Sequence, residues 1–203
     1  MSSSRRVPGR RWVRRIVTSL VLAMGWPGSG VATTPDPALL AGDCAGCHGR
    51  TGVSAGPASP SFAGFDRRYL IRILQEFRND ERPATIMGRI MRGYTATEIR
   101  RIADHYAAQE WGAAEVEVDP TAVERGRRLH EEVCEECHER GGRHQDRDTP
   151  RLAGQWPEYL VLQLEGFRDR PTLAPQPSKM RDALVGVSDG DLAALAIFYA
   201  EQR

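Results

Sequence analysis

Apolar residues recur at helical spacing in three segments of the chain. The first face comprises Tyr69, Leu70, Ile73, Leu74 and Phe77. The second comprises Ile99, Ile102, Ala103 and Tyr106, and the third Leu192, Leu195, Ala196 and Tyr199. Thr95 and Glu98 are spaced as a capping box at the start of the second helix, and Ser188 with Asp191 precedes the third. No segment shows convincing strand alternation, so the pattern predicts an all-helical protein.

The N-terminus has the layout of a secretory signal peptide. Residues 1–15 contain six arginines and no acid, 16–26 form a largely apolar run, and small residues lead to Ala32. The apolar run has only 11 residues, whereas about 20 are needed to span a bilayer. Cleavage after Ala32 is therefore favoured over a membrane anchor, and we expect no stable membrane insertion of the mature chain.

The mature chain reads as a tandem duplication. At an offset of 90, the paired residues include Gly52 with Gly142, Pro60 with Pro150, Tyr69 with Tyr159 and Phe77 with Phe167. After a three-residue insertion the offset is 93, and Met87 pairs with Met180 and Tyr106 with Tyr199. We therefore predict a signal peptide (1–32), a first domain (33–110), a linker (111–119) and a second domain (120–203). The helix before Cys134 is predicted to begin near Thr121 or Ala122, and its counterpart before Cys44 to be shorter.

A pentapeptide that occurs once in each domain carries the candidate chemistry. The two copies are Cys44-Ala45-Gly46-Cys47-His48 and Cys134-Glu135-Glu136-Cys137-His138, and they use all four cysteines of the chain. C-x-x-C-H is the motif of covalent c-type haem attachment. Zinc ribbons place their cysteine pairs closer together, and a thioredoxin-like motif needs a βαβ context that is missing here. The sequence thus predicts two covalently attached haem c groups, which also explains how domains so rich in loops fill a core.

The axial ligands follow from the motif and the repeat. His48 and His138 adjoin the attaching cysteines and are the predicted proximal ligands. Met87 and Met180 share a repeat position and are the predicted distal ligands, because a thioether is a soft ligand that raises the haem potential. Met91 pairs with Leu184 and is interpreted as a core residue. It is the alternative distal ligand of the first haem if Met87 does not bind.

The repeat also bears on the prolines that follow the motifs and on the remaining histidines. A carbonyl near Pro60 or Pro150, each twelve residues after a proximal histidine, is placed to accept that imidazole's second N–H. His105, His130 and His144 have no histidine counterpart in the other domain. These three are predicted to be solvated surface side chains.

Charge narrows the function further. The whole chain has a net charge of +1, but loss of the six N-terminal arginines leaves 22 basic and 27 acidic residues. That sign disfavours a nucleic-acid role. Five acids surround the second attachment site: Glu131, Glu132, Glu135, Glu136 and Glu139. We hypothesise that they steer the second domain toward a basic partner surface, the alternative being a solvated face without a partner.

With these motifs the chain resembles the two-domain, two-haem cytochromes c of the cytochrome c4 type, each half being similar to a class I cytochrome c. The resemblance rests on C-x-x-C-H, Pro60-x-x-Ala63-Gly64 and Pro150-x-Leu152-Ala153-Gly154, the methionine, and the last helix. It implies an all-α tandem repeat and electron transfer in the periplasm. The first half departs at two positions. Phe65 stands in place of Gln155, and Asp36 in place of Gly126, where the family's glycine lets the first and last helices pack closely.

The expected function is therefore a periplasmic electron carrier with two six-coordinate His/Met haems, not an enzyme. Its expected partners are redox proteins: a donor dehydrogenase or membrane complex, and an acceptor oxidase or reductase. Two alternatives stay open. One is that the chain is the cytochrome subunit of a dehydrogenase complex. The other is that it is a haem enzyme with a displaceable distal ligand.

Overall fold

The computed structural model describes residues 35–169 and 178–203. The predicted signal peptide, residues 1–32, lies outside the described residues. Pro35–Arg203 forms one compact unit. Residues 35–110 are called the first half below and residues 120–203 the second half.

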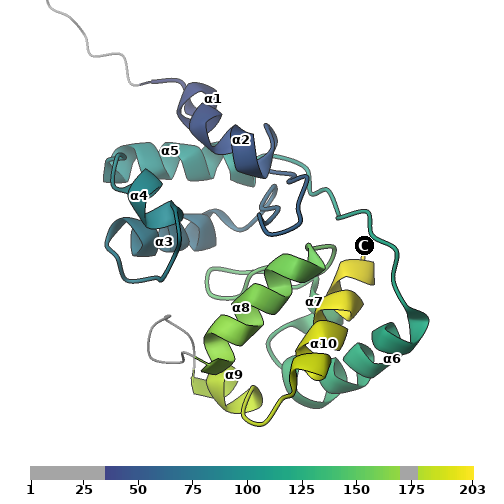
Figure 1. Ribbon diagram of the computed structural model, residues 1–203. Coiled ribbons are helices and arrows are strands. Elements are labelled where there is room, and N and C mark those ends of the chain that lie inside the picture. The colour runs from purple at the N-terminus through teal and green to yellow at the C-terminus, as the bar shows by residue number, and fades with distance from the viewer. Residues whose placement is uncertain (1–34, 170–177) are drawn as a thin grey trace, which may run out of the picture. The chain divides into compact units, whose positions relative to one another are not determined.

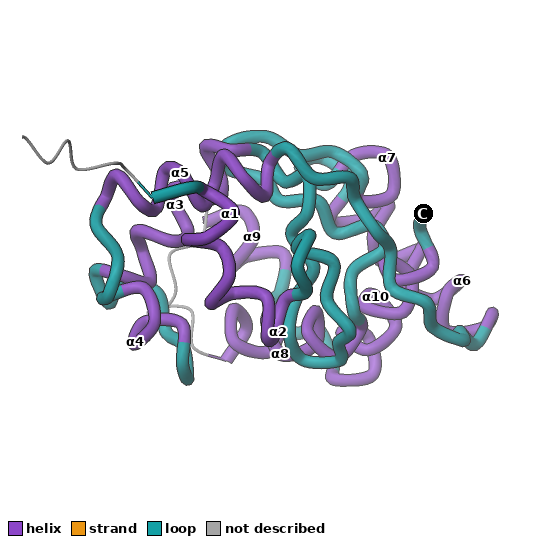
Figure 2. The backbone as a smooth tube through the Cα atoms, turned by 90° about the horizontal axis from the view of Figure 1, so that it is seen from above, coloured by secondary structure: helices purple, strands orange, loops and turns teal. Residues whose placement is uncertain are grey.

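Helices and loops make up the described part of the chain, and no strand occurs in it (Figure 1, Figure 2). The first half contains α1 (Pro37–Leu40), the 3-10 helix η1 (Ala41–Cys44), α2 (Ala45–His48), α3 (Arg67–Arg78), α4 (Met87–Met91) and α5 (Ala96–Ala107). The second half contains α6 (Pro120–Leu129), the π-helix η2 (His130–Cys134), α7 (Glu139–Gly142), α8 (Pro157–Asp169), α9 (Ser178–Ala183) and α10 (Asp189–Glu201). The prediction of an all-helical fold is confirmed.

Each half is built around its last helix. In the first half α5 contacts α1 and α3, and in the second half α10 contacts α6 and α8. The predicted faces of both last helices are buried, because none of their four apolar residues is more than 2% exposed. Both predicted caps are present: Thr95 and Glu98 form a complete capping box, and Ser188 accepts from the backbone N–H of Asp191. Packing of an amphipathic face against neighbours is what stabilises such short helices.

The loop after each attachment motif is held the same way in both halves. Gly52 O accepts from Phe62 N at 2.8 Å and from Ala63 N at 3.1 Å, and Gly142 O accepts from Leu152 N and Ala153 N at 2.8 and 3.0 Å. Both glycines have a positive φ, +83° and +79°, which an L side chain rarely adopts. The repeat read from the sequence is therefore a repeat of backbone structure as well.

The first helices of the two halves differ as the sequence suggested. Gly126 lies on α6 against α10, where an added Cβ would overlap the carbonyl of Ala194 and stand 2.7 Å from the Cβ of Phe198. Its counterpart Asp36 is the N-cap of α1 and accepts from Ala38 N at 2.8 Å. The acidic residue thus marks where the shorter first helix begins, whereas the glycine lies inside the longer one.

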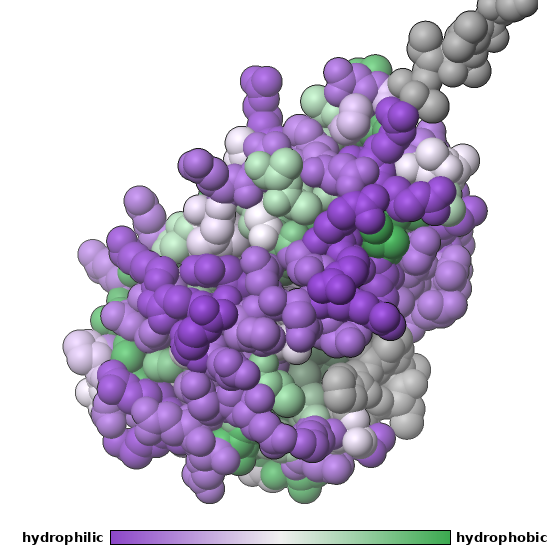
Figure 3. Space-filling view, turned by 180° about the vertical axis from the view of Figure 1, so that it is seen from behind, coloured by the Kyte–Doolittle hydropathy of each residue, from purple (hydrophilic) through white to green (hydrophobic). Residues whose placement is uncertain are grey.

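Most of the face seen in Figure 3 is hydrophilic, with apolar residues scattered between polar ones. The exposed large apolar side chains include Ile86, which precedes Met87, and Val133, which precedes Cys134. Within the described ranges, no helix has the length and apolar character needed to cross a membrane.

Gly126→Ala should lower the free energy of unfolding by about 1–3 kcal/mol, because the new methyl group is forced against backbone atoms of α10. Gly166→Ala is the matched control: this glycine also lies in a helix, α8, but an added Cβ there meets nothing within 4 Å. The control should gain about 0.5–1 kcal/mol from helix propensity. Urea unfolding followed by circular dichroism measures both. Equal effects would contradict the close approach of α6 and α10.

Candidate haem-binding sites

Both pentapeptides lie on helical turns at the end of a helical segment. Cys44 ends η1 and His48 ends α2, while Cys134 ends η2 and His138 caps α7. All four thiols are unpaired, and the second cysteine of each motif is exposed. Residues three and four apart share one side of such a turn. The first cysteine, the second cysteine and the histidine of each motif can therefore meet one flat ligand.

His48 is fixed in a single tautomer. Its Nδ1 donates to the carbonyl of Pro60 at 2.9 Å; a carbonyl only accepts, so the proton is on Nδ1 and the lone pair is on Nε2. Burial lowers the pKa of His48, and the bond to Pro60 opposes that shift. A neutral imidazole with a free Nε2 is the form that binds iron. The predicted bond near Pro60 is confirmed.

His138 has a different environment. Its buried Nδ1 has no hydrogen-bond partner in the described part of the chain, so the predicted bond to a carbonyl near Pro150 is wrong. Burial, with the nearby His130 and His144, lowers the pKa of His138 to about 4. Its imidazole is therefore neutral at pH 7, but its ring orientation is not fixed by the contact that fixes His48.

His130 corrects the prediction of a solvated surface histidine. It is 2% exposed, its Nδ1 lies 2.9 Å from the hydroxyl of Tyr199, and its ring packs against Phe198. The Glu135 carboxylate contacts its Nε2. The burial of His130 could have been predicted from helical spacing, because Val123, Gly126 and His130 share one buried face of α6 and η2.

The three methionines separate by burial. Met91 is 1% exposed and its repeat partner Leu184 is 4% exposed, so the interpretation of Met91 as a core residue holds. Met87 is the first residue of α4 and is half-buried. Met180, on α9, packs against the same apolar cluster as Cys134. Contacts between α9 and η2 bring the helix of Met180 to the second attachment segment.

The donor set of each half fits a covalently held haem. Burial raises the pKa of Cys44 and of Cys134, so both stay thiols at neutral pH, and buried Tyr106 and Tyr199 lie beside them. Each half thus combines two unpaired thiols, a neutral imidazole and a methionine at a repeated position. Groups of three or more His, Cys, Asp or Glu side chains able to hold a bare metal ion do not occur among the described residues.

Two glutamine side chains of the second half bind backbone groups of the first half. Gln155 Oε1 accepts from Ser61 N at 2.9 Å, and Gln155 Nε2 donates to Ser61 O at 2.7 Å. Gln145 Nε2 donates to Gly64 O at 2.9 Å, and Gln145 Oε1 accepts from Asp66 N at 3.1 Å. Gln155 is 1% exposed. Sequence reasoning noted Gln155 as a family position but missed both of these contacts.

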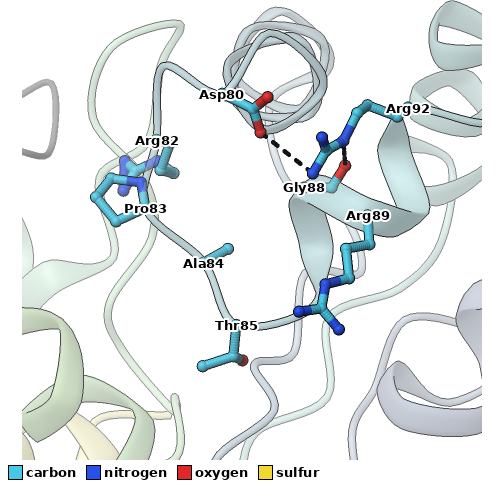
Figure 4. A pocket seen from close by; sticks show the side chains of 8 residues that line it. All are labelled: Asp80, Arg82, Pro83, Ala84, Thr85, Gly88, Arg89 and Arg92. Atoms are coloured by element: carbon cyan, nitrogen blue, oxygen red, sulfur yellow. Dashed lines mark hydrogen bonds and ion pairs between the residues drawn. The ribbon is translucent and has the colours of Figure 1, made fainter.

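An arginine-rich cleft adjoins Met87. Figure 4 shows Arg92 turned toward Asp80, with 3.6 Å between their charged atoms, and Arg89 reaching away from both. The cleft is lined by Asp80, Arg82, Pro83, Ala84, Thr85, Gly88, Arg89 and Arg92. Arg82 also pairs with Glu76 at 3.3 Å, and its guanidinium lies over the rings of Phe77 and Phe167, which are repeat partners. The burial of Glu76 is a second feature that the spacing of apolar residues does not predict.

An all-helical tandem repeat with one attachment motif in each half defines a two-domain c-type cytochrome of class I. No family model matches the chain. It is 30% identical to cytochrome c4 of Thiocapsa roseopersicina (76% of this chain, 84% of the relative) and 25% identical to that of Pseudomonas aeruginosa (92% and 98%). The chain belongs to the cytochrome c4 family.

Two further comparisons agree with this. The crystal structure of reduced cytochrome c4 from Pseudomonas stutzeri superimposes with a TM-score of 0.74 at 23% identity, over 82% of this chain and 97% of that one, and shows the same fold. A protein named thiosulfate dehydrogenase electron acceptor, from Thiomonas intermedia, is 25% identical over 97% of this chain and 93% of its own length. The protein is therefore an electron-carrier cytochrome, and its cofactors are two covalently attached haem c groups.

Glu76→Leu should lower the free energy of unfolding by about 3 kcal/mol, because Arg82, whose side chain is 10% exposed, would lose the partner of its charge. Asp104→Asn removes the partner of Arg67 in a pair whose two side chains are each 47% exposed. It should cost less than about 1 kcal/mol. Urea unfolding of the holoprotein compares the two. A loss no larger for Glu76→Leu than for Asp104→Asn would show that the buried pair contributes no more than the exposed one.

Proposed function

We propose that this protein is a periplasmic dihaem electron carrier with two six-coordinate haems. Cys44 and Cys47 hold the first haem, with His48 and Met87 as axial ligands. In the second half, Cys134 and Cys137 hold the other haem, with His138 and Met180 as ligands. The observation that carries the proposal is the Nδ1-protonated state of His48, which leaves Nε2 as its only free donor.

The chain's own residues then have simple tasks. A haem held this way supplies a one-electron iron couple. The thiols of each half would hold the haem, and the imidazole and the thioether would supply its two protein ligands to iron. With both axial positions filled, no open site remains for a substrate, which is why we propose a carrier and not an enzyme. Cleavage after residue 32 and domains at 33–110 and 120–203, joined by 111–119, belong to the same proposal.

Charge supports distinct docking surfaces for partners. Glu131, Glu132 and Glu139 are exposed beside the second attachment site, whereas Glu135 contacts His130 and Glu136 contacts Lys179. Three acids are thus left to face a partner. In the first half, the cleft beside Met87 has Arg82 paired with Glu76 and Arg92 paired with Asp80, which leaves the charge of Arg89 to face a partner. Opposite charges at the two sites favour partners of opposite charge.

A second candidate is the electron-accepting cytochrome of a dehydrogenase. A relative named for that role covers almost the whole chain. In addition, residues of this chain are 41% identical over 68 positions to the cytochrome subunit of sulfide dehydrogenase from Chlorobaculum tepidum, which is 34% of this chain and 61% of that one. Stable co-purification with a second polypeptide would favour this candidate over a free carrier.

Met87→His should lower one reduction midpoint and leave the other unchanged, because imidazole favours ferric iron more than a thioether does. Met180→His should lower the other midpoint. Each variant should also lose half of the sulfur-to-iron charge-transfer absorbance. A spectroelectrochemical titration of the holoprotein measures midpoints and absorbance together.

Met91→Leu is the control for the two methionine variants, since Met91 lies in the core at a position where the second half has leucine. It should leave both midpoints and the absorbance as they are. Loss of the charge-transfer absorbance in Met91→Leu but not in Met87→His would transfer the ligand role to Met91.

Reversal of the charges at Glu131, Glu132 and Glu139 to lysine should slow association with a basic redox partner by about tenfold at low salt, since steering changes on-rates over this range. The effect should shrink at high salt, because screening shortens the reach of exposed charges. Stopped-flow reduction by a basic cytochrome measures both. Rates unchanged at low salt would leave the acids as a solvated face only.

A further inference from the structure

One peptide group lies between His48 and the second half of the molecule. The carbonyl of Pro60 accepts from His48 Nδ1 at 2.9 Å. The N–H of the same peptide group, on Ser61, donates to Gln155 Oε1 at 2.9 Å. The side chain of Gln155 is therefore joined to the imidazole of His48 through a single amide.

The orientation of the Gln155 amide follows from its partners. Ser61 N–H only donates and Ser61 C=O only accepts, so Oε1 faces the former and Nε2 the latter. Ser61 is 0% exposed and Gln155 1%, which excludes water as a substitute acceptor. Trp156 N also donates to Oε1, at 3.1 Å, and helps to hold the amide in place.

We propose that Gln155 is a positioning residue that lowers the reduction potential of the first haem from across the domain boundary. An acceptor on the N–H of a peptide group polarises its carbonyl, because bonded amides strengthen one another. The carbonyl of Pro60 then draws more strongly on the Nδ1 proton of His48, and the imidazole becomes a more basic ligand. A more basic ligand stabilises ferric iron. This inference rests on the proposed role of His48 as an iron ligand.

The hydrogen-bond relay from Gln155 to the proximal histidine occurs at the first attachment site alone among the described residues. Phe65 stands at the position of Gln155 in the first half and has no side-chain acceptor. His138 Nδ1 has no partner among the described residues through which such a relay would act. Gln155 therefore lowers the potential of the first haem and leaves that of the second unchanged. A lower first potential contributes to electron flow from the first haem to the second.

Gln155→Met tests the relay, because methionine keeps the length of the side chain and removes the acceptor. Titration of the holoprotein should show an upward shift of the midpoint that Met87→His identifies as the first. We expect the ratio of reduced to oxidised first haem at a fixed potential to rise about two- to fivefold, the size expected when the cooperative part of one hydrogen bond is lost. The other midpoint should stay unchanged. The Nδ1 proton of His48, observed by NMR in the reduced protein, should shift to the position of a weaker bond.

Two further variants separate the relay from a general loosening of the structure. Gln145→Met removes an equivalent pair of bonds between the halves, to Gly64 and Asp66, without touching the peptide of Ser61. It should leave the first midpoint and the Nδ1 proton in place. Gln155→Glu keeps an acceptor for Ser61 N–H and should not move the Nδ1 proton toward the position of a weaker bond.

The outcomes distinguish this inference from the function beneath it. An unchanged first midpoint in Gln155→Met, or an equal shift in Gln145→Met, overturns the relay while low-spin His/Met spectra leave the carrier function standing. If the first haem of the His48→Ala variant keeps a low-spin spectrum, the role of His48 as an iron ligand is overturned, and the relay with it.

Discussion

The loop that follows each attachment motif is held at two fixed points, and the rest of the site depends on this. Gly52 O accepts two backbone N–H groups of the loop, and Tyr106 O accepts a third from Gly64 at 2.8 Å. The second half repeats the arrangement, with Gly154 N donating to Tyr199 O at 2.7 Å. Backbone groups buried in a loop must find partners, and here they find them in a glycine carbonyl of the loop itself and in a tyrosine carbonyl near the end of the last helix. In the first half this arrangement positions the carbonyl of Pro60, which orients the proximal histidine His48.

Regular features of the fold could be predicted because they depend on local chemistry. The helical faces, the capping box at Thr95 and the shorter first helix all follow from spacing and from residue type. The bond from His48 to Pro60 followed from the repeat and from the general need to orient a ligating imidazole. What the sequence did not indicate were contacts between distant segments, such as those of Gln155 with Ser61. The spacing of apolar residues also does not show that Glu76 is buried, where it pairs with Arg72 one turn earlier on α3 and with Arg82 in the loop that follows.

The two halves differ in their first helices and in the partner of the tyrosine on the last helix. Gly126 allows α6 to run past α10 and continue into η2, so the second half gains the space in which His130 is buried. In the first half Asp36 begins a shorter helix, and Tyr106 donates its hydroxyl proton to the carbonyl of Ala41 at 3.0 Å. The equivalent tyrosine, Tyr199, bonds a histidine side chain instead. A titratable group thus stands beside the second attachment site where the first has a peptide carbonyl.

The two glutamine contacts between the halves bear on how such a duplication can change. Gln145 and Gln155 belong to the second half, but both bind backbone groups of the first. A backbone group is present whatever residue stands there, so substitutions in the first half can leave these bonds intact. A change at either glutamine removes two bonds between the halves at once, and at Gln155 it leaves the buried N–H and C=O of Ser61 unsatisfied, at a cost of about 1–3 kcal/mol for each group. Side chains of both halves contribute to the boundary, since Arg72 of the first half donates to the carbonyls of Arg147 and Asp148 at 3.4 Å. Among them, Gln155 is the one whose bonds also reach the proximal histidine of the first half.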